Sequence, residues 1–127
     1  MKNIVFTGLL LIFVSVFHSS HAQQASKSET LSERKFQKLM KKENVAIIDV
    51  RTEKEYSEGH IPDAQNIDVQ NENFAAQIQS LDKSKTYLLY CRSGKRSAKA
   101  LNILKEAGFK KVYHLKDGFM EWDGAKK

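Results

Sequence analysis

A single cysteine lies at the head of a short basic loop. Cys91 is the only cysteine in the chain, and the stretch that follows it combines three cationic side chains with a glycine. The nucleophilic form of a cysteine is the thiolate, which positive surroundings favour. The residues that follow Cys91 are Arg92, Ser93, Gly94, Lys95, Arg96 and Ser97. The composition of this loop therefore predicts a reactive cysteine.

The backbone of the loop is expected to reinforce its charge. Residues 86–90 read TYLLY, which is typical of a buried strand, and residues 97–107 have the apolar spacing of a helix. A tight strand-to-helix connection aims successive N–H groups into one concavity that holds an anion, and Gly94 lets the chain pass close to a ligand. A buried structural cysteine is the alternative, but the cations around Cys91 favour the reactive interpretation.

Strands and helices alternate along the chain. The hydrophobic patterns predict helices that begin at a capping box in 30–33 and, later, at 52–59, 73–81 and 97–107. Strands are predicted at 45–50, 66–69, 86–90 and 112–115. This order predicts an α/β fold with a mostly parallel sheet and helices on both faces. Active sites of such folds lie beyond the carboxyl ends of the strands, which is where Cys91 is placed.

The first 22 residues have the three-part pattern of a secretory signal peptide. Lys2 precedes an apolar run over 4–17, and Ser20-His21-Ala22 ends in the small residues that a signal peptidase reads, so cleavage is expected after Ala22. A membrane anchor is the alternative, but the run is shorter than the roughly 17–25 residues of a spanning helix. We expect an exported protein, periplasmic rather than fully secreted, with a flexible leader over 23–29 and one domain over 30–127.

Composition excludes some classes of function. Lys2 is the one charged residue in 1–22, so 20 of the 21 basic residues and all 15 acidic residues remain in 23–127, for a net charge of +5. These basic residues are scattered rather than gathered in a stripe with aromatic residues, which argues against nucleic-acid binding. No His, Cys or carboxylate pair has metal-ligand spacing, so we expect no metal.

Three motifs resemble those of the rhodanese sulfurtransferases. Residues 91–97 are similar to the family's active loop, C-R-S-G-x-R-S, and residues 49–67 resemble its pattern D-V-R-x-x-x-E-Y-x-x-G-H-I-P-G-A-x-N-I. Residues 117–122 are similar to G-G-x-x-x-W. The resemblance covers nearly all of the chain after the signal, and it implies a sheet of about five strands. Asp63 and Asp117 stand where the family usually has glycine, so we expect local changes in these turns.

The resemblance implies a double-displacement reaction. The Cys91 thiolate would take sulfur from a small anionic donor such as thiosulfate and become a persulfide, and cyanide, a thiol or a protein sulfur carrier would then remove that sulfur. The resemblance implies no cofactor. It assigns the donor's charge to Arg92, Lys95 and Arg96, and it assigns the persulfide to the loop N–H groups, Gly94 included, and to the hydroxyls of Ser93 and Ser97.

The remaining polar residues are expected to be structural. Asp49 and Arg51 flank a strand end and are interpreted as support for the site, paired with Glu55 or with the loop. His60 is expected to bond backbone atoms in its turn, and His114 is interpreted as a packing or surface residue in its strand.

Two other functions compete with sulfur transfer. Cysteine phosphatases and arsenate reductases of related fold need five residues between cysteine and arginine, whereas Arg96 follows Cys91 one position too early. A non-catalytic binding module of the same fold is the second alternative. Such modules often lack the cysteine, which this chain keeps.

Overall fold

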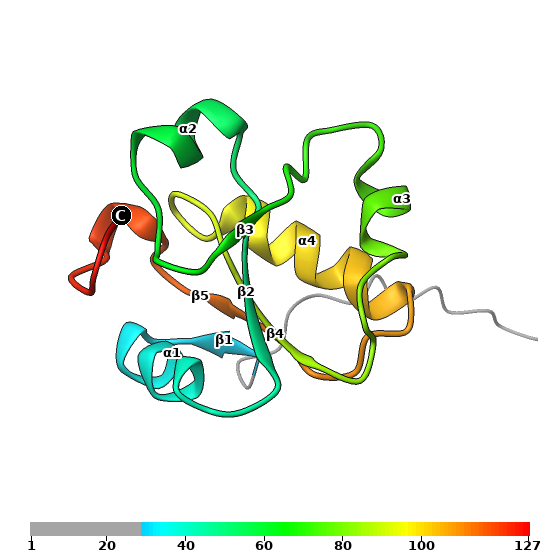
Figure 1. The fold of residues 1–127 in the computed structure, drawn as a ribbon, viewed down its shortest axis with the longest axis horizontal. Coiled ribbons are helices and arrows are strands. Elements are labelled where there is room, and N and C mark those ends of the chain that lie inside the picture. Colours follow the sequence, from blue (N-terminus) through cyan, green and yellow to red (C-terminus); the bar gives the residue numbers. More distant parts are fainter. Residues whose placement is uncertain (1–28) are drawn as a thin grey trace, which may run out of the picture.

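A computed structural model describes residues 29–127 as a five-stranded, wholly parallel sheet. The strand order is β1-β5-β4-β2-β3 (Figure 1). The strands are β1 (Thr30–Leu31), β2 (Val45–Asp49), β3 (Gln65–Asn66), β4 (Thr86–Tyr90) and β5 (Val112–Leu115). The predicted α/β class and parallel sheet are confirmed. The predicted signal peptide, 1–22, and all but the last residue of the leader lie outside the described residues.

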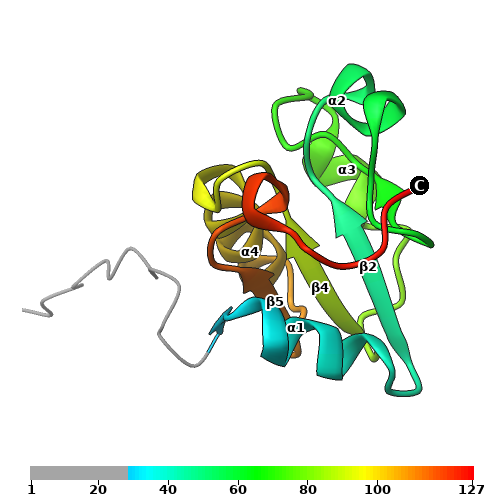
Figure 2. The same ribbon diagram turned by 90° about the vertical axis from the view of Figure 1, so that its left-hand side faces the viewer.

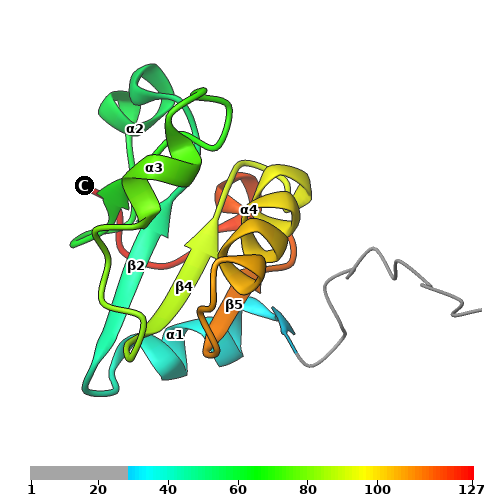
Figure 3. The same ribbon diagram turned by 90° about the vertical axis from the view of Figure 1, so that its right-hand side faces the viewer.

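Helices cover both faces of the sheet, as predicted. They are α1 (Glu33–Met40), α2 (Glu53–Glu58), α3 (Phe74–Ile78), α4 (Lys95–Glu106) and the single 3₁₀ turn η1 (Phe119–Glu121). Figure 2 shows α1 and the C-terminal segment in front of the sheet, and Figure 3 shows α3 and α4 in front of the opposite face. Within residues 29–127, none of these helices has the length and apolarity that a bilayer crossing requires.

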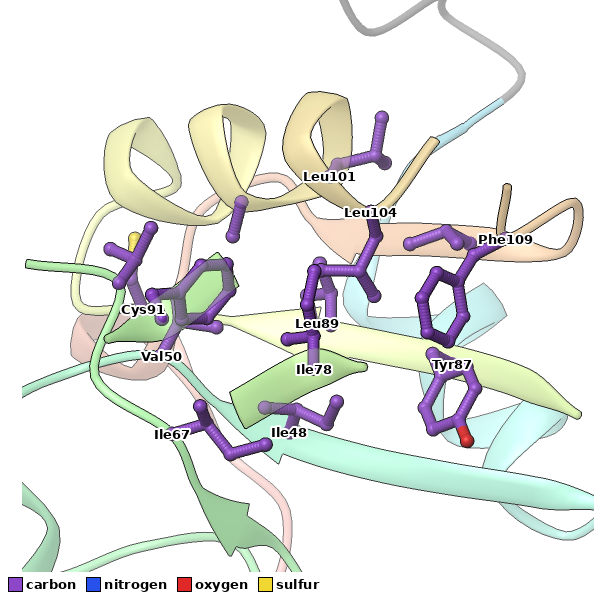
Figure 4. Packing of buried hydrophobic residues seen from close by; sticks show 14 residues of the cluster. Ile48, Val50, Ile67, Ile78, Tyr87, Leu89, Cys91, Leu101, Leu104 and Phe109 are labelled. Carbon is purple, nitrogen blue, oxygen red and sulfur yellow. The ribbon is translucent and has the colours of Figure 1, made fainter. Parts of the chain in front are cut away.

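The two faces are built by the alternation of side chains along the central strands. On one face, Ile48 and Leu89 pack with Leu101 and Leu104 of α4, and Cys91 lies at the edge of the same cluster (Figure 4). A second cluster on the other face includes Ile47, Leu88, Phe36 and Trp122. The register of β4 therefore sends Cys91 toward α4 rather than toward α1.

The helix α2 begins and ends where the sequence predicts. The Thr52 side chain accepts a hydrogen bond from the backbone N–H of Glu55, and the Glu55 carboxylate accepts one from the backbone N–H of Thr52, which completes a capping box. Gly59 ends the helix. This short helix therefore holds Glu55 at a fixed place above the carboxyl end of β2.

The first helix begins later than predicted. Ser32, not Thr30, caps α1, and Thr30 and Leu31 instead form β1, which pairs with His114 and Leu115 of β5. The reason is that a two-residue strand has no alternation to recognise, whereas the pattern Thr-x-x-Glu at its start imitates a capping box.

Three further elements differ in length from their predictions. The strand predicted at 66–69 is only the pair Gln65–Asn66, the helix predicted at 73–81 is only Phe74–Ile78, and α4 begins two residues before the predicted start. The early start places Lys95 and Arg96 in the first turn of α4 instead of in the loop.

Candidate active site

Cys91 lies directly after β4, with its sulfur turned inward beneath the loop. The Gly94 N–H donates to Cys91 Sγ at 3.1 Å, and the Ser97 hydroxyl oxygen lies 3.6 Å from the sulfur. Cys91 is only 1% exposed, whereas Arg92, Ser93 and Lys95 are exposed. The sequence analysis favoured a reactive cysteine over a buried structural one. The structure shows that Cys91 is buried, because Sγ faces the start of α4.

The C-terminal motif holds this loop in place. Gly118 has φ of 69°, and a side chain on it would collide with the carbonyl of Arg92. The N–H groups of Phe119 and Met120 donate to the carbonyls of Cys91 and Arg92 at 2.8 and 3.0 Å. Sequence analysis recognised residues 117–122 as a motif but did not predict that this segment holds the cysteine loop, because the support depends on contacts between distant segments.

Gly94 is required at the opposite side of the loop. It has φ of 100°, a region that side chains rarely adopt, and a Cβ there would collide with the carbonyl of Lys116. The glycine therefore brings its own N–H onto Cys91 while the loop rests against the chain after β5. The sequence analysis expected Gly94 to approach a ligand, and the structure shows in addition its close approach to the Lys116 carbonyl.

One cation of the motif is bound in an ion pair, and two are exposed. The Arg96 guanidinium binds Glu55 through both terminal nitrogens, at 2.7 and 2.9 Å. The hydrogen bonds to Arg96 lower the pKa of Glu55 to about 2, against a desolvation effect of opposite sign. Arg92 and Lys95 are exposed and make no ion pair within residues 29–127.

Asp49 and Arg51 form a buried pair. Arg51 Nη2 donates to Asp49 Oδ2 at 2.7 Å and to the Gly59 carbonyl at 2.7 Å. Arg51 is 4% exposed and Asp49 is 0% exposed. Burial disfavours the charged guanidinium, but the hydrogen bonds and charge of Asp49 outweigh it, so the pKa of Arg51 is raised. The expected pairing with Glu55 or with the loop is wrong, because Glu55 is occupied by Arg96.

Arg51 also supports the aromatic residues beside the loop. Its guanidinium carbon lies 4.4 Å from the ring centre of Phe119 and 5.6 Å from that of Tyr90. Burial of Tyr90, reinforced by Asp49, raises the pKa of its phenol, so the Tyr90 hydroxyl stays neutral. The predicted supporting role of Arg51 thus includes packing against η1.

Ser97 connects Cys91 to a histidine that sequence reasoning left without a polar role. Ser97 Oγ lies 2.9 Å from His114 Nδ1, and His114 Nε2 lies 3.1 Å from Thr30 Oγ1. His114 is 4% exposed, and burial lowers its pKa, partly offset by the charge of Glu29. The alternation of 112–115 could have indicated this position, since Val112 and His114 share the face under α4. His60, as expected, bonds a backbone carbonyl, that of Tyr56, at 2.9 Å.

A pocket of about 420 Å³ opens next to the loop. It mixes cations, carboxylates and apolar surface, and its lining residues are Arg51, Glu55, Glu58, Gly59, Arg92, Phe119 and Met120. Residues 29–127 contain no group of three His, Cys, Asp or Glu side chains that could hold a metal ion. The pocket presents Arg92 of the loop to a ligand, whereas Cys91 is buried beneath the loop and is not among the lining residues.

Comparisons with known proteins agree with this geometry. The model of the rhodanese-like domain matches residues 32–125. The chain is 37% identical over 91 residues to YtwF of Bacillus subtilis, covering 72% of this chain and 85% of that protein. It is 34% identical over 95 residues to a sulfurtransferase of Allochromatium vinosum, covering 75% and 83% of the two chains.

A solved structure shows the same fold. The rhodanese-like domain of the Anabaena sp. protein Alr3790, solved by NMR in solution, superposes with a TM-score of 0.70 at 26% identity, covering 78% of each chain. The family match spans the cysteine loop, the buried Asp49–Arg51 pair and the Gly118 turn that supports the loop. This chain belongs to the rhodanese-domain family of sulfurtransferases.

Proposed function

We propose that the chain transfers sulfane sulfur through a persulfide on Cys91. The thiolate attacks the outer sulfur of thiosulfate and forms a new S–S bond, while the donor's S–S bond breaks and its electron pair leaves with sulfite. Cyanide or a thiolate then attacks the terminal sulfur, which gives thiocyanate or a new persulfide and returns Cys91 as a thiolate. The single nucleophile thus divides one transfer into two displacements.

The contact from the Gly94 N–H to Cys91 Sγ carries this proposal. A backbone donor fixed at the start of α4 stabilises negative charge on sulfur and needs no reorganisation during the reaction. Because the loop is held by Gly118 and by the N–H groups of Phe119 and Met120, the Gly94 N–H stays directed at Cys91 Sγ. The same cradle suits the thiolate and the persulfide anion.

The substrates follow from the exposed charges. Arg92 and Lys95 flank the cysteine with no ion pair among the described residues, so they are available to a small anionic donor. The pocket beside Arg92 opens to solvent, and it can admit a small thiol or the cysteine of a protein acceptor.

Replacement of the nucleophile tests the proposal. Cys91→Ser should retain the fold and lose transfer from thiosulfate to cyanide, because Cys91 is the only thiol in the chain. Wild-type protein treated with thiosulfate should gain the mass of one sulfur atom, and the serine variant should gain none. A serine variant as active as the wild type would overturn the covalent mechanism, and an inactive wild type with every donor would favour a binding module.

We also propose that this reaction takes place after export, with the periplasm as the compartment. The short apolar run and Ser20-His21-Ala22 support a signal peptide cleaved after Ala22. The native protein should therefore begin at Gln23. A native protein whose mass includes residues 1–22 would reject cleavage and favour a membrane anchor.

A further inference from the structure

Three buried polar side chains stand in line beneath the loop. Cys91 Sγ lies 3.6 Å from Ser97 Oγ, and Ser97 Oγ lies 2.9 Å from His114 Nδ1. The far ring nitrogen of His114 lies 3.1 Å from the hydroxyl of Thr30 on β1. Cys91, Ser97 and His114 are 1%, 0% and 4% exposed, so bulk water has little access to this line.

We propose that His114, acting through Ser97, accepts the Cys91 proton when the thiolate forms and returns it when a thiol is regenerated. His114 is then a positioning residue for the nucleophile, since it touches Ser97 rather than the reacting sulfur. The inference rests on Cys91 acting as the nucleophile, as proposed above. It assigns a role to β5 and β1, which the loop motif does not include.

The proton balance closes within the three side chains. The relay requires a thiol form in which Cys91 donates to Ser97 Oγ, Ser97 turns to donate to His114 Nδ1, and the neutral imidazole carries its proton on Nε2, beside Thr30 Oγ1. Transfer moves the thiol proton to Ser97 Oγ and the serine proton to His114 Nδ1. The products are a thiolate and an imidazolium, with the serine hydroxyl restored between them, and no other reactant is needed.

Ser97 can serve both states because its hydroxyl has a choice of partners. It donates to the Gly94 carbonyl at 3.1 Å, and it can instead turn toward His114 Nδ1 or toward Cys91 Sγ. A hydroxyl rotor donates one proton and accepts through two lone pairs, which suits it to a position between a thiol and an imidazole. The Gly94 N–H then stabilises the thiolate from the other side.

The charges that surround His114 are few. On the β4 side the ionisable neighbour is Cys91, and α4 brings Ser97 and, farther along, Lys105. On the β1 side lies Glu29, whose carboxylate binds Lys105 Nζ at 2.8 Å and whose carbonyl accepts from the His114 N–H at 2.9 Å. Burial lowers the pKa of His114, which favours the neutral ring while Cys91 is a thiol, and a thiolate close by would compensate the charge that the ring acquires.

The reaction of Cys91 with iodoacetamide across a pH range tests the relay without requiring sulfur transfer. His114→Asn keeps a hydrogen-bonding atom near Ser97 but cannot take the proton. Near neutral pH this variant should react about tenfold more slowly than the wild type, with its pH curve displaced upward by about one unit. At high pH the two rates should converge, because hydroxide then removes the proton directly.

His60→Asn is the matched control. His60 also bonds through Nδ1, but to the Tyr56 carbonyl, and its ring stacks on Tyr56 with centroids 3.8 Å apart. This variant should leave the alkylation curve unchanged. If the curve of His114→Asn coincided with that of the wild type, His114 would have only a packing role and the relay would be overturned.

A measurement on the unchanged protein covers the case in which His114→Asn does not fold. At a fixed pH near neutrality, the imidazole ¹⁵N shifts of His114 should show Nδ1 protonated to the extent that Cys91 is a thiolate, because the transfer exchanges no proton with the solvent. Alkylation of Cys91 at the same pH should remove that protonation. If the ¹⁵N shifts of His114 did not change when Cys91 is alkylated, the relay would be overturned. If the shifts did change but the protein transferred no sulfur, only the proposed function would be overturned.

Discussion

The cationic side chains of two regions beside Cys91 differ in whether they are bound in ion pairs. In the region that faces α2, Arg51 and Arg96 are bound by Asp49 and Glu55, with closest contacts of 2.7 Å. Arg92 on the loop and Lys95 in the first turn of α4 are exposed, and no ion pair reaches them within residues 29–127. Of these four cations, Arg92 and Lys95 are therefore the two whose charge no ion pair among the described residues neutralises.

The difference separates the construction of the site from its chemistry. A guanidinium that donates to a carboxylate and to a backbone carbonyl, as Arg51 does, fixes β2 to the turn after α2. Arg96 fixes α4 to α2 in the same way, although its pair is partly open to solvent. Charge near a nucleophile is therefore evidence of substrate binding only after its partners are known.

The largest effect is expected from Arg51→Met. This change leaves the Asp49 carboxylate buried without its partner, and loss of one partner of a buried pair reduces stability by about 3–5 kcal/mol. Urea unfolding at neutral pH measures the loss. Arg92→Met is the matched control and should change stability by less than about 0.5 kcal/mol, because Arg92 is exposed and has no ion pair within residues 29–127. Equal losses in the two variants would remove the distinction between the regions.

The sequence was most informative where the relevant residues are contiguous. The run from Thr86 to Ser97 indicated a strand, a loop and a helix start, and the structure has these elements in that order. The departure at Asp63 is also understandable, since this residue takes φ of 67° in a turn where the family has glycine. Asp and Asn accept this left-handed region more readily than other residues with side chains do.

Pairings between distant residues could not be predicted in this way. Glu55 and Arg96 are 41 positions apart, and Ser97 and His114 are 17 apart, so no local spacing reports either contact. The partner of Arg96 depends on how α2 is placed above α4, which is a result of packing. Chemistry was therefore predicted at the loop, but the division of its cations into bound and exposed groups was not.

The second largest effect is expected in donor use. Arg92→Ala removes an exposed cation that can meet the anionic donor, and a charge-assisted hydrogen bond contributes about 1.5–3 kcal/mol. The kcat/KM for thiosulfate should fall about ten- to a hundredfold, while the kcat/KM for a neutral persulfide donor should fall much less.

Arg96→Ala is the comparison for that experiment. Because its guanidinium is bound to Glu55, its loss should disturb the start of α4 and reduce the use of charged and neutral donors alike. If kcat/KM fell for thiosulfate but not for the neutral donor in Arg96→Ala, and fell for neither donor in Arg92→Ala, the anionic donor would bind Arg96 instead of Arg92. The resemblance to the family includes Arg96 among the donor-binding residues.

The smallest effect is expected from Glu55→Gln, and it should depend on pH. The folded pKa of Glu55 lies at about 2, below its ordinary value near 4.5, so its contribution to stability is fully present above that ordinary value and is lost as the pH falls through 2. Because both partners are about a quarter exposed, at 24% and 27%, we expect a loss of about 1 kcal/mol or less at neutral pH.

The control for Glu55 lies on the same helix. Glu58 is exposed and has no ion pair within residues 29–127, so Glu58→Gln should leave stability nearly unchanged at every pH. Urea unfolding of both variants and the wild type at about pH 7, 4 and 2.5 measures the difference. The deficit of Glu55→Gln should shrink toward the lowest pH, because the wild-type carboxylate becomes protonated there and its ion pair with Arg96 is lost. If the loss of stability in Glu55→Gln did not change with pH, the Glu55–Arg96 pair would contribute through packing rather than charge. The contrast between ion-paired and exposed cations would then depend on Arg51 alone.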